Sequence, residues 1–111
     1  MEGICYIEEI DGEEWVVFNE MFNEELTPDI IQFLSKYKRV KFGEKFNQPV
    51  DIPDKDSPDG KSSILPQSLT HLEFGGKFNK PINMFPSSLK ELKISKKYQY
   101  PLQNNIVIKK I

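Results

Sequence analysis

The chain has 111 residues, of which 38% are hydrophobic and 29% charged, a balance typical of one small globular domain spanning residues 1–111. The single cysteine excludes an internal disulfide framework, and the lack of a long apolar run favours a soluble cytoplasmic protein over a membrane protein. The net charge of −2 hides an asymmetry, because residues 1–76 carry 16 acidic and 7 basic side chains, whereas residues 77–111 carry one and eight. This charge asymmetry has two alternative explanations. One is that the fold has two surfaces of opposite sign, and the other is that its C-terminal end binds an acidic partner or a nucleic acid.

Residues 4–18, ICYIEEIDGEEWVVF, predict a β-hairpin. Asp11-Gly12 between two alternating apolar runs is the signal of a type I′ turn. The predicted register gives two pairs on the core side, Ile7 with Val16 and Cys5 with Phe18. We expect this hairpin to cap the open edge of the fold and Cys5 to be a buried structural thiol.

Residues 26–37, LTPDIIQFLSKY, predict a helix packed on the far side of the first turn of the fold. Thr27 is a favoured N-cap, Pro28 suits the first helical position and Asp29 suits the positive end of the helix dipole. The predicted apolar stripe is Ile30, Phe33, Leu34 and Tyr37.

One motif recurs four times along the chain. Its copies are VVFNEMFNEEL at 16–26, VKFGEKFNQPV at 40–50, LEFGGKFNKPI at 72–82 and LKISKKYQYPL at 92–102. The steps between copies are 24, 32 and 20 residues, and fixed cores with variable spacers are typical of a solenoid in which each copy forms one turn. Alternating apolar residues at the start of each copy predict one short strand per turn, parallel to the next.

Parallel turns in register stack equivalent residues into columns. The predicted columns are Val16, Val40, Leu72 and Leu92; Phe18, Phe42, Phe74 and Ile94; and Phe22, Phe46, Phe78 and Tyr98. Gly43 and Gly75 follow the strands, where a bend or a positive φ would require glycine. Pro49, Pro81 and Pro101 predict extended return segments, with Val50, Ile82 and Leu102 pointing inward.

Two segments lie outside the motif. Residues 51–63, DIPDKDSPDGKSS, are rich in Asp but lack the spacing of an EF-hand calcium loop, so a mobile surface loop is expected. Residues 103–111, which end in NNIVIKKI, predict a final strand that closes the other edge of the sheet.

The motif resembles the FNIP repeat, a relative of leucine-rich repeats known from social amoebae and from the giant viruses that infect amoebae. LPQSLTHLEFGGKFNKPI at 65–82 carries the resemblance almost end to end, and the likeness extends over about residues 16–102. It implies a mainly β fold, a short leucine-rich-repeat-like parallel β-solenoid of about four turns with an N-terminal β-hairpin cap and one α-helix. It also implies that Asn23, Asn47 and Asn79 bond backbone groups of neighbouring turns. A composition of 14 Lys, one Arg and no Ala indicates an AT-rich genome, in agreement with such an origin.

The sequence contains no Ser/His/Asp order, no cluster with metal-ligand spacing and no phosphate-binding glycine loop. We therefore expect no enzyme activity, catalytic residue, metal or cofactor. The candidate binding residues are those predicted to point outward from the strands: Trp15, Arg39, Lys41, His71, Glu73, Glu91 and Lys93, with Val17 beside them. These side chains either pair in charge across the strands or form a concave binding surface anchored by Trp15 and Arg39.

The favoured function is a protein–protein interaction module that binds a host or viral protein through the exposed solenoid surface, in the host cytoplasm if the source is a virus. One alternative is a nucleic-acid or ribosome-associated module that uses the lysine-rich C-terminal third. A chain with a single Arg is a weak match to that role, since Arg is the preferred reader of bases and phosphates. The other alternative is a structural unit that assembles head to tail through its acidic and basic ends. No membrane partner is expected.

Overall fold

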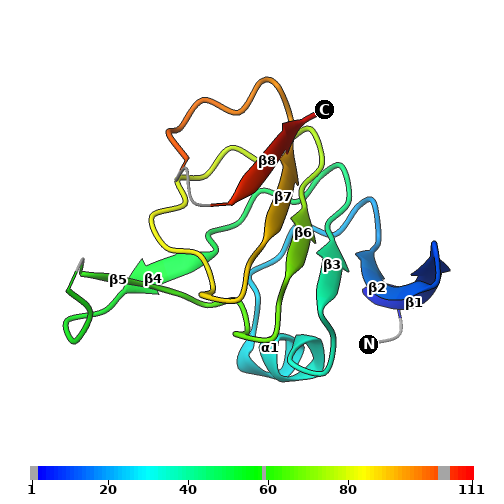
Figure 1. Ribbon diagram of the computed structural model, residues 1–111, viewed down its shortest axis with the longest axis horizontal. Coiled ribbons are helices and arrows are strands. Elements are labelled where there is room, and N and C mark those ends of the chain that lie inside the picture. The colour runs from blue at the N-terminus through cyan, green and yellow to red at the C-terminus, as the bar shows by residue number, and fades with distance from the viewer. Residues whose placement is uncertain (1–2, 59, 103–105) are drawn as a thin grey trace.

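The computed structural model describes residues 3–58, 60–102 and 106–111. Its main sheet has the strand order β1-β2-β3-β6-β7-β8. Five strands run parallel in successive turns: β2 (Glu13–Phe18), β3 (Arg39–Lys41), β6 (His71–Glu73), β7 (Glu91–Ile94) and β8 (Val107–Lys110). Figure 1 shows β3, β6, β7 and β8 side by side, with the return segments passing behind them. The prediction of a mainly β, leucine-rich-repeat-like solenoid is confirmed, with about five turns.

The N-terminal hairpin has the predicted turn and register. β1 (Cys5–Ile10) pairs antiparallel with β2, with Cys5 opposite Phe18 and Ile7 opposite Val16. Asp11 and Gly12 have φ values of 54° and 83°, as a type I′ turn requires. The predicted burial is wrong, because Cys5 is only half-buried and Ile7 is 38% exposed. The physical reason is that β1 is an outermost strand, and the hairpin curls away from the rest of the sheet (Figure 1).

The single helix, α1 (Pro28–Leu34), lies below the strands in Figure 1 and leads into β3. As predicted, the Thr27 side chain caps it, with Oγ1 accepting a hydrogen bond from the Ile30 backbone N–H at 3.3 Å. The helix ends sooner than the predicted 26–37, because the chain turns at Ser35. Ile30 and Leu34 are buried, and Phe33 and Tyr37 pack at the edge of the core.

The predicted inward columns form the core. The strand registers place Val16 beside Val40, Val40 beside Leu72 and Leu72 beside Leu92, and Ile108 of β8 extends this column. The third column is a stack of aromatic rings whose centroids are separated by 6.0 Å (Phe22–Phe46), 6.1 Å (Phe46–Phe78) and 5.8 Å (Phe78–Tyr98). The return segments add Val50 and Ile82, both buried, and Leu102, partly buried. Each turn therefore buries its apolar side chains against equivalents in the next turn.

The glycines that follow β3 and β6 have a different role from the one expected. Neither Gly43 nor Gly75 has a positive φ. Instead, a Cβ at Gly43 would lie 2.6 Å from Glu20 Cα, and a Cβ at Gly75 would lie 2.7 Å from Glu44 Cα and also against the Gly43 carbonyl oxygen. Glycine is needed here because the backbones of adjacent turns approach more closely than a side chain permits.

Residues 51–63 are not the irregular loop that was predicted. They form a second hairpin, in which β4 (Asp51–Pro53) pairs antiparallel with β5 (Lys61–Ser63) and which projects from one side of the solenoid (Figure 1). Its base is fixed to the next turn, because Asp51 is buried and its Oδ2 accepts a hydrogen bond from the Asn83 N–H at 2.6 Å. Three-residue strands without apolar alternation gave no sequence signal for this pairing.

The final strand is β8, which pairs parallel with β7. The predicted segment began at residue 103, and residues 103–105 lie outside the described part of the chain. In β8, Ile108 is partly buried whereas Val107 and Lys110 are exposed, so the strand extends the sheet but covers little of the core.

Candidate functional site

The side chains predicted to point outward come together on the face of the sheet opposite the core, called here the outer face. Two rows cross the strands on this face. One row contains Trp15, Arg39, His71, Glu91 and Val107, and the other contains Val17, Lys41, Glu73, Lys93 and Lys109. The structure therefore gathers all seven candidate binding residues on one surface, as in-register parallel strands require.

Most charges on the outer face are paired with a neighbour in the adjacent strand. Arg39 Nη1 lies 3.1 Å from Glu13 Oε2. Glu73 receives two lysines, with Lys41 Nζ at 3.6 Å and Lys93 Nζ at 4.0 Å. The row of alternating charge seen in the sequence is thus a set of cross-strand ion pairs.

Two members of this network were not predicted. Glu13 is the partner of Arg39, and Lys109 Nζ lies 2.8 Å from Glu91 Oε1. The Lys109 contact lowers the pKa of the Glu91 carboxyl below its usual value. Alternation along each strand could have identified both residues, since Glu13 is two positions before Trp15 and Lys109 two positions after Val107.

His71 is a neutral member of the outer face. Burial, followed by the nearby Arg39 charge, lowers the pKa of its imidazole below the ordinary value of 6.5. Its Nε2 is 3.9 Å from Glu91 Oε2, and its Nδ1 is 2.9 Å from Thr70 Oγ1. A neutral ring at pH 7 makes the Glu91 contact a weak one, and the imidazole also has an aromatic neighbour.

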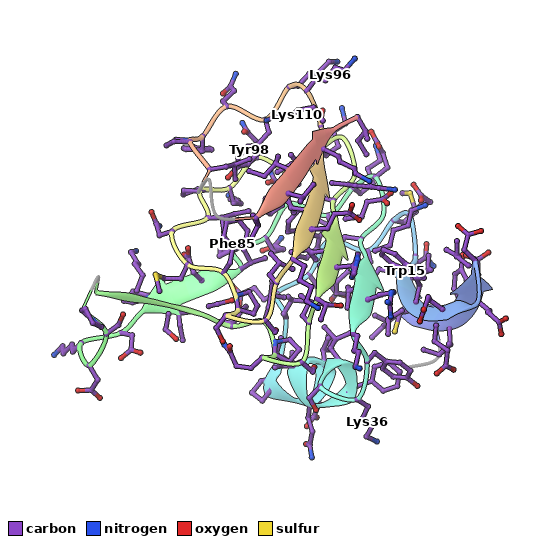
Figure 2. The ribbon with its side chains drawn as sticks, viewed as in Figure 1. Trp15, Lys36, Phe85, Lys96, Tyr98 and Lys110 are labelled. Atoms are coloured by element: carbon purple, nitrogen blue, oxygen red, sulfur yellow. The ribbon has the colours of Figure 1, made fainter. Side chains whose placement is uncertain are left out.

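This aromatic neighbour is the ring of Trp15. Its centroid lies 6.3 Å from the His71 centroid in an edge-to-face arrangement, although β3 separates their two strands. Figure 2 shows Trp15 between β2 and β3. Val17, which was expected to be exposed with Trp15, is instead buried at 7% exposure. Trp15 is half-buried, so it keeps part of its surface available on the outer face.

The asparagines have the structural role that the repeat implied. Asn23 Oδ1 accepts from the Asn47 N–H at 2.8 Å, Asn47 Oδ1 from the Asn79 N–H at 2.9 Å, and Asn79 Oδ1 from the Gln99 N–H at 3.2 Å. This ladder is partly exposed rather than buried. Its amide oxygens satisfy backbone donors of the next turn, so they are committed to the fold.

A second ladder was not predicted. Glu20 Oε2 accepts from the Glu44 N–H at 3.0 Å, and Glu44 Oε2 accepts from the Gly76 N–H at 3.1 Å. These carboxylates link turns just after the strands, and they too belong to the fold. The spacing of Glu20 and Glu44, 24 residues like the motif step, was the signal that could have found them.

An apolar cleft with a volume of about 600 Å³ lies between α1 and the β4–β5 hairpin, and the sequence gave no indication of it. Its apolar lining consists of Leu26, Pro28, Ile31, Pro49, Ile52 and Ile64. Ile52 of β4 is 49% exposed at its rim. The cleft exists because the inserted segment folds as a hairpin, and so it could not be expected from an irregular loop.

Within residues 3–58, 60–102 and 106–111, no helix is long and apolar enough to cross a membrane. In the same part of the chain, no three His, Cys, Asp or Glu side chains come together as a potential metal site. Cys5 is a free thiol whose pKa is raised by burial, which opposes the thiolate form that nucleophilic chemistry needs.

Comparison with known proteins gives a family and a related structure. A family model described as FNIP Repeat matches residues 60–97. The crystal structure of CroV588, described as a novel circular leucine-rich-repeat protein, is similar with a TM-score of 0.61 and 29% identity over 83% of this chain. The matched region is 12% of the CroV588 chain, so this chain spans a small part of that protein's length. No curated protein matches. The chain thus contains an FNIP repeat at residues 60–97 and has a leucine-rich-repeat-like fold.

Proposed function

We propose that this protein is a non-enzymatic interaction module that binds another protein through the outer face of its sheet. The observation that carries the proposal is the position of Trp15, which lies half-buried against His71 at one end of the rows of ion pairs. Tryptophan and arginine are the residue types most enriched among the energetically dominant contacts of protein interfaces. Repeat solenoids commonly bind partners through the surface formed by their stacked strands.

The residues proposed to contact the partner are Trp15, Arg39, Lys41, His71, Glu73, Glu91 and Lys93. The ion pairs of Arg39, Lys41 and Lys93 restrict these long side chains before binding, which lowers the entropy that an interface would cost. The side chains of Lys41 and Lys93 remain 41% and 38% exposed on either side of Glu73. A partner that presents carboxylates to these lysines and a basic group to Glu73 would complement the surface.

The nucleic-acid alternative is less well supported. Of the lysines in the C-terminal third, Lys109 is paired with Glu91 at 2.8 Å, and Lys93 shares the Glu73 carboxylate with Lys41. Lys110 Nζ lies 5.6 Å from the centre of the Tyr98 ring, and Figure 2 shows the two side chains close together. Phosphate binding would have to compete with these internal contacts. The free thiol of Cys5 and the likeness to a giant-virus protein favour action in the cytoplasm, that of the host if the chain is viral.

The test compares three variants in capture experiments from amoebal lysate, with and without nuclease. Trp15→Ala with Arg39→Ala should abolish capture of a nuclease-resistant protein partner. Changing Lys96, Lys97, Lys109 and Lys110 to Gln should leave it largely intact. Ile52→Asp at the rim of the apolar cleft should also leave it intact.

The same variants distinguish the outer face from the two other possible binding sites. If the lysine variant alone loses binding, and does so in a nuclease-sensitive and salt-dependent way, the site is the basic C-terminal surface and the ligand a nucleic acid. If Ile52→Asp alone loses binding, the site is the cleft beside α1. Capture that survives Trp15→Ala with Arg39→Ala in every condition refutes the outer face as the site.

A further inference from the structure

The two outermost strands of the main sheet, β1 and β8, have exposed apolar side chains of a kind that the inner strands lack. Tyr6 and Ile7 of β1 are 56% and 38% exposed. Val107 of β8 and the adjacent Ile111 are 57% and 55% exposed. In the part of the chain that the structure describes, no strand pairs with the outer side of either one. The unpaired backbone N–H and C=O groups of such edge strands can pair with a strand of another chain.

The backbone of each edge offers hydrogen-bonding groups at known positions. Just before β1, the Ile4 carbonyl accepts a hydrogen bond from the Asn19 N–H at 2.8 Å, so the backbone N–H and C=O groups at even positions point toward β2. The backbone groups of Cys5, Ile7 and Glu9 point away from β2. At β8, the N–H groups of Val107 and of the adjacent Ile111 donate to the carbonyls of Lys90 and Ile94 at 3.0 and 2.9 Å. Alternation then directs the N–H and C=O groups of Ile108 and Lys110 away from β7.

The backbone groups that point away from each sheet in β1 and in β8 are complementary in one antiparallel register. If Ile7 lies opposite Lys110 and Glu9 opposite Ile108, the outward backbone groups of both strands meet as hydrogen-bonded pairs. The pairs between them are then Tyr6 with Ile111, Glu8 with Lys109 and Ile10 with Val107. The side chains of these three pairs all lie on the outer face, because Glu8 is paired with Trp15 in the β1–β2 register and Lys109 with Lys93 in the β7–β8 register. An ion pair is flanked on both sides by apolar pairs, which is a favourable cross-strand arrangement.

The charges of the two edges are complementary beyond this single pair. β1 and its turn carry Glu8, Glu9 and Asp11, and β8 carries Lys109 and Lys110. On the core side, Glu9 and Lys110 would be diagonal neighbours, within reach of long side chains. Lys109 can keep its contact with Glu91 of its own chain, because one ammonium group has three donors.

We propose that the occupant of each edge is a second copy of this chain, with β1 of one copy pairing antiparallel with β8 of the next. Since β1 runs opposite to the other strands of its sheet, the solenoid strands of all copies would point the same way. The contact joins two different edges, so it leaves one of each free at the ends of every assembly and allows growth beyond a dimer. This proposal does not depend on the outer-face binding site.

The experiment measures molar mass by sedimentation at increasing concentration of the 111-residue chain. The parent chain should rise above the monomer mass of 12.9 kDa as its concentration approaches about 1 mM. Glu8→Lys places two ammonium groups opposite each other, and Lys109→Glu places two carboxylates, so each alone should weaken association about tenfold. Asp56→Lys, at the tip of the β4–β5 hairpin, makes the same change in net charge as Glu8→Lys and should leave association unchanged.

Mixing the two single variants gives the most specific readout. The altered β1 of one variant then meets the altered β8 of the other, and the two unaltered edges also match, so association should return to the parent level. The double variant Glu8→Lys, Lys109→Glu should recover it as well. If a charge reversal fails to fold by circular dichroism, Glu8→Gln and Lys109→Gln replace it, with an expected weakening of about threefold.

Three outcomes would overturn the proposal. The first is a parent chain that stays at 12.9 kDa over the whole concentration range. The second is an equal effect of Glu8→Lys and Asp56→Lys, which would assign the change to net charge. The third is a mixture of the single variants that associates no better than either alone, which would show that β1 and β8 do not meet.

Discussion

The central turns of the solenoid and the β4–β5 hairpin are both built from three- or four-residue strands, yet they are held in different ways. In the central turns, Phe74 is fully buried, with its ring centroid 3.8 Å from that of Phe78 and 5.5 Å from that of Phe42. In the hairpin, Ile52 at the middle of β4 is 49% exposed, and the strands are joined by backbone pairing. Strand pairing alone is therefore not what stabilises this fold, and the inward columns should contribute most of the stability.

The largest expected effect is that of Phe74→Ala, which removes a ring from the middle of the aromatic columns. Because the neighbouring rings are fixed by their own stacking, the cavity should not collapse, and unfolding should become easier by about 3–5 kcal/mol. Chemical denaturation followed by circular dichroism measures this loss. Ile52→Ala in the hairpin is the matched control and should cost less than about 1 kcal/mol. Similar losses for the two variants would contradict the contrast between the regions.

Gly75→Ala tests the close approach of adjacent turns. The new Cβ would lie 2.7 Å from Glu44 Cα, a backbone atom that cannot move without displacing its turn. We expect a loss of about 1–3 kcal/mol, as for overpacking elsewhere in proteins. Gly76→Ala is the control, because the nearest neighbour of its Cβ would be the Glu44 carboxylate at 2.9 Å, the far end of a flexible side chain. An equal effect at both positions would show that the approach of the turns is not the constraint.

Asn47→Ala removes one step of the asparagine ladder and should have a smaller effect. It leaves the Asn79 N–H without the amide oxygen that now accepts its hydrogen bond at 2.9 Å. The expected loss is about 1 kcal/mol, since the ladder is partly exposed and water can replace the lost acceptor. Hydrogen exchange should accelerate at the Asn79 amide and remain slow at the Leu72 amide in β6. Unchanged exchange at Asn79 would mean that the ladder contributes nothing.

The sequence predicted the regular part of the molecule well, because each copy of the motif tests the register inferred from the other copies. Each inward position occurs several times, so the register of Val40 with Leu72 could be inferred from the motif alone. It predicted least where a feature occurs once. The β4–β5 hairpin has no second copy, and its Asp- and Pro-rich tip is compatible with many loop structures.

The sequence predicted the candidate site only in part, for a similar reason. Alternation along the strands was enough to place Trp15 and His71 on one face, but it could not show that their rings meet across β3 at 6.3 Å. It also could not show that Val17 would be covered by its neighbours, since burial of an outward residue depends on the conformations of long side chains around it.

A smaller effect is expected from pH, through His71 on the outer face. Its folded-state pKa lies below the unfolded value of 6.5, so the unfolded chain binds a proton more readily. The contribution of the neutral His71 to the free energy of unfolding should therefore be fully present above about pH 6.5. It should decrease as the pH falls from there toward the folded-state pKa. The decrease should be smaller than the loss in Asn47→Ala, because the ring is partly exposed. His71→Gln should remove this dependence above about pH 5, where Glu91 is still ionised. A parent and variant with parallel pH profiles would contradict the assignment.

The smallest effect should follow from shortening the β4–β5 hairpin, and it is the sharpest test of the contrast with the central turns. The Asp54 N–H donates to the Gly60 carbonyl at 2.9 Å, so this pair can flank a two-residue turn. Replacing residues 55–59 with Asn-Gly would close the hairpin in a type I′ turn and leave Asp51 and its bond to Asn83 in place. Loop closure depends weakly on length, and none of the removed residues belongs to an inward column, so the free energy of unfolding should change by less than about 0.5 kcal/mol. The matched variant Asp51→Ala keeps the tip but removes the buried acceptor, and it should cost about 1–3 kcal/mol. If shortening the tip costs as much as Asp51→Ala, the hairpin is part of the packed fold. If it costs nothing, the solenoid is held by its columns and by the inter-turn bonds at the base of the hairpin.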